Sequence, residues 1–175
     1  PTATGWERQA VQAPALGTLS AYGIDDPHVA DDPYAESYFL NYADFLTPEY
    51  STDAGPGGKK WEATRGIGTS FGYNRAETDA DYLSTTELVH LLVDIVANGG
   101  NLLLNVGPDA EGRLPAEFIE RAEAIGEWMD RHGELVYGSE AGEVCEFITY
   151  GRQVRKGNNL YLVIRFWDGR LSLTL

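Results

Sequence analysis

Glu49 is the residue whose type and setting best fit acid catalysis. It follows Pro48, which disfavours helix at Thr47 and keeps the approach extended, and it precedes Tyr50. The rings of Tyr50 and Phe45 are expected to make the surroundings less polar, which favours the protonated form of a carboxyl group. A protonated carboxyl can protonate the oxygen that leaves when a glycosidic bond breaks, a reaction that also needs a second carboxylate. On composition alone, the alternative is a solvated glutamate in a loop.

Two further segments carry residue types that suit sugar binding. Trp61 and Glu62 combine an aromatic face with a hydrogen-bonding carboxylate, and the C–H groups of a pyranose pack on aromatic faces. Phe71, followed by Gly72, fits a loop at the C-terminal end of a strand, where the active sites of parallel barrels lie. The alternatives are a core tryptophan beside a surface glutamate, and a core phenylalanine.

Other polar residues give weaker signals. Asn105 falls at the C-terminal end of a predicted strand, where its amide could orient a loop or reach the site, and the structural use is preferred. The three histidines are scattered over a loop, a helix and a helix end, and they receive no role. Their positions are His28, His90 and His132. No cluster has the spacing of a metal site.

The composition limits the possible partners. At 175 residues, the chain is long enough for one sizeable core, or for part of a larger domain plus the start of another, and a hydrophobic content of 43% excludes wholesale disorder. A net charge of -14 argues against nucleic acid, because a phosphate backbone would be repelled, and favours a neutral or cationic partner. The apolar stretches 88–96 and 102–106 are too short to cross a bilayer, so no membrane span is expected.

The acidic, lysine-poor composition predicts a halophilic protein. Only Lys59, Lys60 and Lys156 are lysines. Such a surface suits high salt, whereas self-repulsion destabilises the fold at low salt. The alternative is an ordinary acidic protein from a genome that favours arginine codons. Cys145 has no partner for an internal disulfide and is expected to be buried in a strand.

The start of the chain does not indicate a cellular location. The sequence begins at Pro1 without a leader-like pattern, so any signal peptide is expected upstream, and both a cytoplasmic and a secreted location stay open.

The middle of the chain predicts alternating strands and helices. Residues 64–73 resemble a strand that runs into a loop. Ser84 and Glu87 form a capping box before an apolar stripe that ends at Gly99, which predicts a helix. Residues 101–106 predict a strand buried on both faces, and a second helix is expected from Pro115 to about His132. This order predicts a parallel α/β fold.

The two ends of the chain look different. Residues 1–42 are rich in Pro, Gly, Ala and Asp without a sustained period, which predicts an irregular loop or insertion. Residues 144–150, 159–167 and 170–175 are strand-like, and Asp168-Gly169 predicts a hairpin turn. We expect a domain boundary within 139–142, which divides the chain into 1–139 and 140–175.

Four segments in fixed order resemble a known family. They are Thr47–Tyr50, Trp61–Glu62, Ser70–Asn74 and Gly99–Pro108. Over about residues 44–138 the chain is similar to glycoside hydrolase family 29, the retaining α-L-fucosidases. The resemblance implies that 1–139 is the C-terminal portion of a (β/α)8-like barrel and that 140–175 starts a C-terminal β-sandwich.

The resemblance also implies roles for single residues. Glu49 would act as acid and then base in a double-displacement hydrolysis of terminal α-L-fucosides, without metal or organic cofactor, on a fucosylated oligosaccharide or glycoconjugate. Phe71 would contact the fucose, whereas Trp61 and Glu62 match a family motif with a less direct role. The nucleophilic aspartate belongs to an earlier barrel strand and is expected upstream of Pro1.

The chain departs from the family pattern, and other functions stay open. A long Asp- and Pro-rich stretch precedes the acid/base motif, and part of the family takes its acid/base residue from another loop. The chain by itself is expected to be inactive, because a half-barrel leaves sheet edges uncovered. The alternatives are a barrel glycosidase for another sugar, or a non-catalytic carbohydrate-binding relative or inactive gene fragment.

Overall fold

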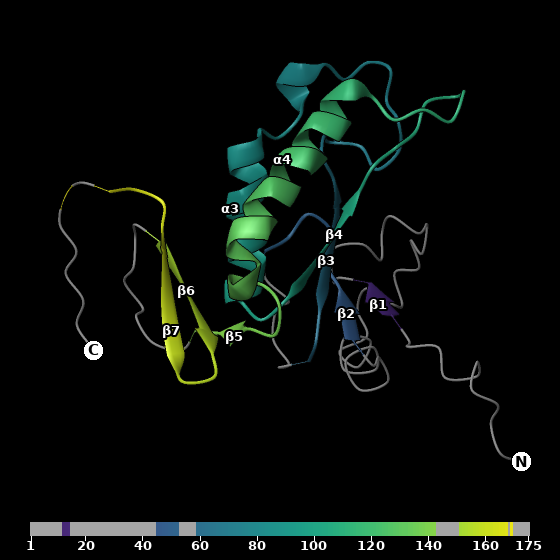
Figure 1. Cartoon of the computed structure of the whole chain (residues 1–175). Coiled ribbons are helices and arrows are strands. Elements are labelled where there is room, and N and C mark those ends of the chain that lie inside the picture. Colours follow the sequence, from purple (N-terminus) through teal and green to yellow (C-terminus); the bar gives the residue numbers. More distant parts are fainter. Residues whose placement is uncertain (1–11, 15–44, 53–58, 143–150, 168, 170–175) are drawn as a thin grey trace, which may run out of the picture.

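The computed structural model describes residues 12–14, 45–52, 59–142, 151–167 and 169 (Figure 1). Its strands are β1 (Gln12–Pro14), β2 (Phe45–Thr47), β3 (Glu62–Gly66), β4 (Asn101–Asn105), β5 (Glu140–Ala141), β6 (Gly151–Lys156) and β7 (Asn159–Ile164). Its α-helices are α3 (Thr85–Ala97) and α4 (Ala116–His132), and short 3-10 helices span Asp79–Asp81 and Gly133–Leu135. The chain is therefore a mixed structure of helices and strands, as predicted.

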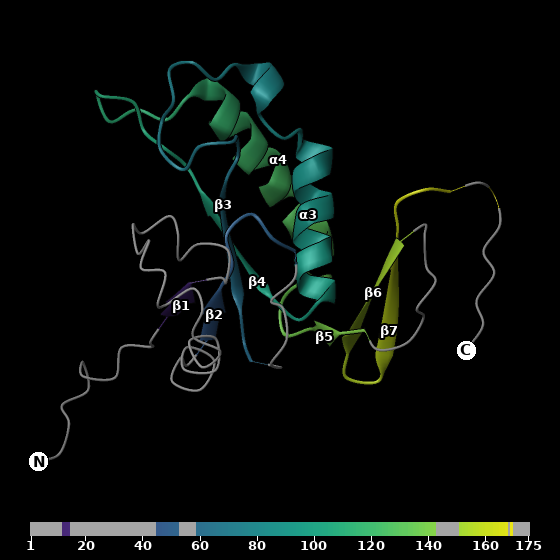
Figure 2. The same cartoon turned by 180° about the vertical axis from the view of Figure 1, so that it is seen from behind.

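The first four strands run parallel and side by side. β1 pairs with β2, β3 pairs with β4, and two parallel bridges, Leu46 with Trp61 and Glu49 with Thr64, join the β2 segment to β3. Seen from behind, β1 and β2 lie next to β3 and β4, and the helices lie to one side of these strands (Figure 2). Because parallel strands place their carboxyl ends at one edge, the residues that follow β2, β3 and β4 come together there.

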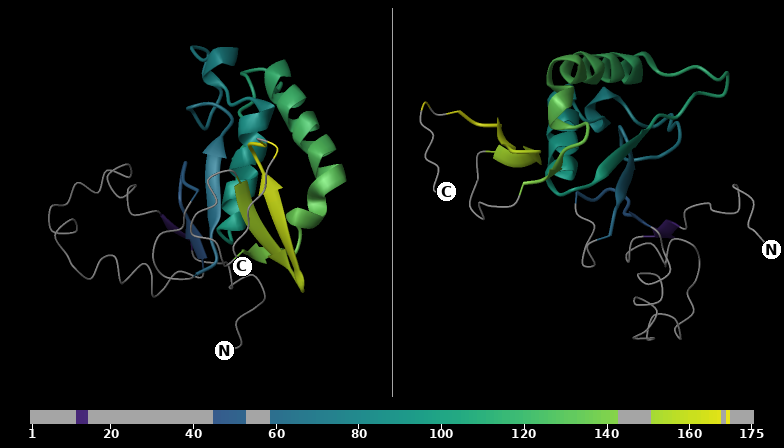
Figure 3. Two further views of the ribbon diagram at one scale, coloured as in Figure 1. Left: turned by 90° about the vertical axis from the view of Figure 1, so that its left-hand side faces the viewer. Right: turned by 60° about the horizontal axis from the view of Figure 1, so that its bottom comes forward.

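The helices cover one face of these strands. α3 connects β3 to β4 and lies against them, and α4 packs beside α3 on the same side, which the turned views make clear (Figure 3). Ile95 of α3 packs with Leu46, Trp61 and Ala63, and Leu88 packs with Ile67 and Phe118 in a second cluster. The core thus lies between strands and helices, and the opposite face has no described helix.

The predicted helix after Ser84 is confirmed. Ser84 accepts a hydrogen bond from the backbone N–H of Glu87, while the Glu87 carboxylate accepts from the backbone N–H of Ser84 at 2.8 Å. Two backbone donors that the helix leaves unpaired are satisfied in this way. The helix ends before Gly99, whose φ of 76° is readily adopted only without a side chain. The second helix begins one residue after Pro115 and ends before Gly133, close to its predicted bounds.

Strand β4 is present, but its predicted burial on both faces is wrong for the described residues. Leu102 and Leu104 pack toward the helices, whereas Leu103 is 50% exposed. Alternate residues of a strand point to opposite faces, and only the helix-facing side is covered by described elements. An all-apolar run cannot reveal which of its faces has a partner.

The last three strands form a separate antiparallel sheet in the order β5-β6-β7, placed beside α3 (Figure 1). An ionic cluster links it to α3. The Asp94 carboxylate pairs with Arg152 Nε at 2.6 Å and with Arg165 Nη2 at 2.5 Å, and Arg165 also donates to the carbonyl of His90 at 2.8 Å. The side chains of Asp94 and Arg165 are only 16% and 15% exposed, so solvent screens this pair weakly.

Asp94→Ala is expected to lower the free energy of unfolding by about 2 kcal/mol, because it leaves two arginines without their shared carboxylate. Glu140→Ala is the matched control: Glu140 pairs with Arg155, and both side chains are more than half exposed. Its loss should stay below about 1 kcal/mol. Chemical denaturation of both variants checks this, and equal losses would show that the Asp94 cluster does not join the sheet to α3.

The predictions for the two ends of the chain are tested only in part. Within 1–42, predicted as irregular, residues 12–14 form the short strand β1, since pairing with β2 stabilises an extended segment that has no periodic pattern of its own. The predictions for the rest of 1–42, for 144–150 with Cys145, for Asp168 of the predicted turn and for 170–175 lie outside the described residues. Among the described helices, none is long and apolar enough to cross a membrane.

Candidate active site

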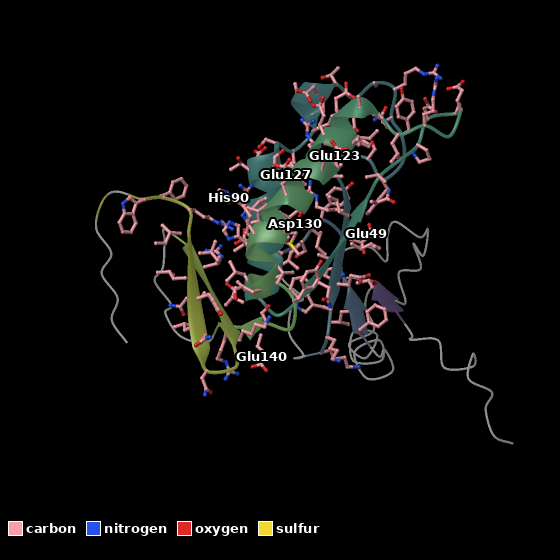
Figure 4. All side chains as sticks on the ribbon, viewed as in Figure 1. Glu49, His90, Glu123, Glu127, Asp130 and Glu140 are labelled. Carbon is pink, nitrogen blue, oxygen red and sulfur yellow. The ribbon has the colours of Figure 1, made fainter. Side chains whose placement is uncertain are left out.

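The register of the strands determines which side chains share the face away from the helices. Ala63 packs toward α3, so its neighbours Glu62 and Thr64 project to the other side. Glu49 forms a parallel bridge with Thr64 and therefore projects to the same side. We call this helix-free side of β2–β4 the open face. Figure 4 shows Glu49 on this side of the strands, opposite Glu123 and Glu127 of α4.

Glu49 lies just beyond the end of β2. Its backbone is held by β3, because Thr64 N–H donates to the carbonyl of Pro48 at 3.0 Å and Tyr50 N–H donates to the carbonyl of Thr64 at 3.1 Å. The side chain is exposed, so the less polar surroundings expected from the sequence are not provided by the described residues. An exposed carboxyl at the carboxyl edge of parallel strands is accessible to a substrate.

Tyr50 has an unusual backbone. Its φ of 51° lies in the left-handed region, which costs a residue with a side chain roughly 1–3 kcal/mol. The Tyr50 ring meets the ring of Phe71 edge to face, with centroids 5.1 Å apart, and the Tyr50 hydroxyl accepts a hydrogen bond from Gly66 N–H at 3.4 Å. These contacts hold the strained turn immediately after Glu49.

Arg65 completes the surroundings of Tyr50. Its guanidinium carbon lies 5.0 Å from the centre of the Tyr50 ring, and its Nε donates to the carbonyl of Gly66 at 3.1 Å. Partial burial lowers the pKa of Arg65 from its ordinary value, and Tyr50 partly offsets this. The guanidinium remains charged at any working pH. In the described part of the chain, Arg65 forms no ion pair with a carboxylate.

Phe71 lies in the loop that follows β3. The Asn105 side-chain amide donates to the carbonyl of Phe71, which confirms the preferred structural use of Asn105 at the end of β4. A Cβ added at Gly107 would overlap the backbone of Gly72 and Tyr73, so only glycine permits this close approach. The loop is therefore fixed against the carboxyl end of β4, where its Phe71 contacts the ring of Tyr50.

Glu77 closes the same loop from its other end. Its carboxylate accepts hydrogen bonds from the hydroxyl and from the backbone N–H of Thr69, the latter at 3.0 Å. The hydrogen bond from the Thr69 side chain is the main cause that lowers the pKa of Glu77. Since the folded loop favours the charged form, this support is present above the carboxyl's unfolded pKa and is lost as pH falls through the lowered folded value.

Trp61 and Glu62 lie at the start of β3, away from the carboxyl edge. Trp61 is only 3% exposed, packs in the core with Ile95 and donates from its indole N–H to the carbonyl of Asn98 at 3.2 Å. An added Cβ at Gly100 would overlap the indole, so ring and glycine are in close contact. Glu62 is half-buried and lies on the open face, two residues before Thr64 in β3.

The structure thus links Glu49 to Phe71 through the ring of Tyr50. Glu62 lies on the same face as Glu49 but nearer the start of β3, and Trp61 lies in the core. Among the described residues, no group of His, Cys, Asp and Glu could hold a metal ion.

Residues 6–134 match the family model described as Alpha-L-fucosidase, which is most of the chain. The chain belongs to the α-L-fucosidase family.

Known relatives agree with this assignment. An α-L-fucosidase from Dictyostelium discoideum is 46% identical over 112 residues, which cover 62% of this chain and 24% of that protein. A human tissue α-L-fucosidase is 34% identical over 140 residues, which cover 77% of this chain and 29% of that protein. The crystal structure of Thermotoga maritima α-fucosidase in complex with fucose matches with a TM-score of 0.60 and 39% identity, over 78% of this chain and 35% of that one. The chain therefore spans about a quarter to a third of the length of these relatives.

The contact of Arg65 with the ring of Tyr50, next to Glu49, was not predicted from the sequence. The available signal was a charged residue inside a predicted strand, between Thr64 and Gly66, where a helix-facing side chain is usually apolar. Its position over the Tyr50 ring depends on the pairing of β3 with the β2 segment.

A cavity of about 630 Å³ lies elsewhere, between α3, α4 and the start of β4, and is lined mainly by apolar side chains.

Proposed function

We propose that this chain provides the acid/base half of the active site of an α-L-fucosidase that hydrolyses terminal α-L-fucosides with retention of configuration. The observation that carries the proposal is the exposed Glu49 at the carboxyl edge of parallel strands, with Phe71 packed against the adjacent Tyr50. Family membership and the relative solved with fucose support it. In this proposal residues 1–139 are the C-terminal part of a (β/α)8-like barrel and 140–175 begin a β-sandwich.

The first step breaks the bond between fucose and its aglycone. Glu49 donates its proton to the glycosidic oxygen, and the electron pair of the C1–O bond goes to that oxygen as the aglycone leaves. A second carboxylate, which we assign to an aspartate upstream of Pro1, forms an ester bond to C1 from the opposite face. Glu49 lies on the open face, away from the core, where its exposed carboxyl is accessible to a sugar.

The second step returns the site to its starting state. The Glu49 carboxylate takes a proton from a water molecule, whose oxygen attacks C1 while the ester bond breaks toward the aspartate. Two inversions at C1 give net retention. Phe71 contributes an aromatic contact to the fucose, Glu62 is available to a sugar hydroxyl from the same face, and Trp61 supports the site by packing beneath it.

The test determines which anomer of fucose is released first. It uses the protein as its gene encodes it, including any residues on either side of 1–175. We expect NMR to show α-L-fucose before mutarotation, from an aryl α-L-fucoside. Initial release of the β anomer would exclude retention. Turnover of another aryl glycoside in preference to the fucoside would support the other-sugar alternative, and no turnover of any would support the non-catalytic one.

A further inference from the structure

Tyr50 connects the proposed acid/base residue, Glu49, with the proposed sugar-contacting residue, Phe71. It follows Glu49 directly in the chain, and its ring meets Phe71 on one side and the Arg65 guanidinium on another. Its hydroxyl accepts from Gly66 N–H, so β3 holds both the ring and the backbone of Tyr50. No other described contact connects the segments of Glu49 and Phe71 so directly.

The backbone at this point needs such support. A tyrosine at φ 51° relaxes to a more favourable conformation if nothing holds it, and that relaxation would rotate the peptide that joins it to Glu49. The Arg65 Nε bond to the carbonyl of Gly66 fixes the guanidinium on the same strand that accepts Tyr50 N–H. A cation over an aromatic ring is attractive and has a defined geometry, which restricts the ring further.

We propose that Tyr50 and Arg65 form a positioning clamp that sets the Glu49 carboxyl and the Phe71 ring at fixed places relative to each other, so that the proton reaches the leaving oxygen. The inference rests on the proposed function. Neither clamp residue is assigned to touch the reacting atoms: both act through Glu49.

A clamp of this kind affects proton donation more than sugar binding. A general acid must lie within hydrogen-bond reach of its acceptor, and a misplacement of about 1 Å can cost on the order of 10²-fold. A leaving group that needs no proton is insensitive to that error. The ratio of rates on two such fucosides therefore reports on the position of the acid, and a general loss of folding would lower both rates together.

The experiment measures kcat/KM of the full protein on methyl α-L-fucoside, which needs a proton, and on α-L-fucosyl fluoride, which does not. Arg65→Ala should lower the value by about 10–100-fold on the methyl fucoside and by less than about threefold on the fluoride. Arg65→Lys should recover most of the loss, because an ammonium group also binds an aromatic face. Arg155→Ala, at an exposed ion pair in β6, is the matched control and should change neither value.

Tyr50→Phe keeps the ring and removes the acceptor for Gly66 N–H, and it serves if Arg65→Ala does not fold. It should lower only the methyl fucoside value, by roughly 3–10-fold. Equal losses on both substrates in a variant that folds, or no loss on either, would overturn the clamp. If Glu49→Ala shows the selective loss and the clamp variants do not, only the clamp fails. If the wild-type protein turns over neither fucoside, the proposed function fails and the clamp with it.

Discussion

Glu49→Ala is expected to lower kcat/KM for an unactivated α-L-fucoside by about 10²–10⁴-fold, the usual contribution of a general acid. The physical reason is that an alkoxide leaving group requires a proton in the transition state. Glu49 is the described carboxyl residue that pairs with Thr64 at the carboxyl edge of the strands. An aryl fucoside with a good leaving group should lose far less in kcat/KM, because its oxygen departs without full protonation. Steady-state kinetics with both substrates measure the difference.

Glu123→Ala is a matched control for this prediction. Glu123 is exposed on α4, on the helix side of the strands, and its removal should leave both kinetic values within about twofold (Figure 4). A fall of the same size for the two leaving groups in Glu49→Ala would point to a binding or structural role. Wild-type rates in Glu49→Ala would move the search for the acid to another carboxylate.

Trp61→Ala is expected to lower the free energy of unfolding by about 3–5 kcal/mol, a large part of the stability of an ordinary domain. The indole is 3% exposed, fills the space between Ile95 and Gly100, and its N–H is paired with the carbonyl of Asn98. Its removal leaves a cavity and an unpaired carbonyl. Chemical denaturation monitored by circular dichroism gives the loss directly.

Trp167→Ala is the control of the same residue type. Trp167 is 64% exposed, and its replacement should cost less than about 0.5 kcal/mol. The pair of variants also decides between the two interpretations of Trp61. Unchanged stability with a raised KM in Trp61→Ala would make Trp61 a sugar platform, contrary to its position in the core.

Local patterns predicted the elements that depend on neighbouring residues. The capping box of Ser84 and Glu87 fixes the start of α3, and Gly99 marks its end, because both signals act within one helical turn. Asn105 could be assigned to loop support because a strand end and a following loop are neighbours by construction. The parallel strand-helix-strand unit was predicted because strand-like and helix-like hydrophobic patterns alternate along the chain.

Contacts between distant segments were not readable in the same way. Leu103 looks like its leucine neighbours, yet its exposure depends on which face the helices cover. The left-handed Tyr50 is not a glycine or an asparagine, and the residues that contact its ring, Arg65 and Phe71, come later in the chain. Trp61 carried both a core and a sugar-binding interpretation until its contact with Gly100 and Ile95 placed it inside.

The most direct test of the central claim is chemical rescue of Glu49→Ala by azide, in the full protein with an activated aryl α-L-fucoside. A small anion can enter the space left by the carboxylate and attack the fucosyl-enzyme without base assistance. We predict that azide raises the turnover of Glu49→Ala, has little effect on the wild-type protein, and yields fucosyl azide of retained α configuration. Full activity of Glu49→Ala without azide, or a β-configured azide product, would contradict the assignment of Glu49 as the acid/base residue of a retaining α-L-fucosidase.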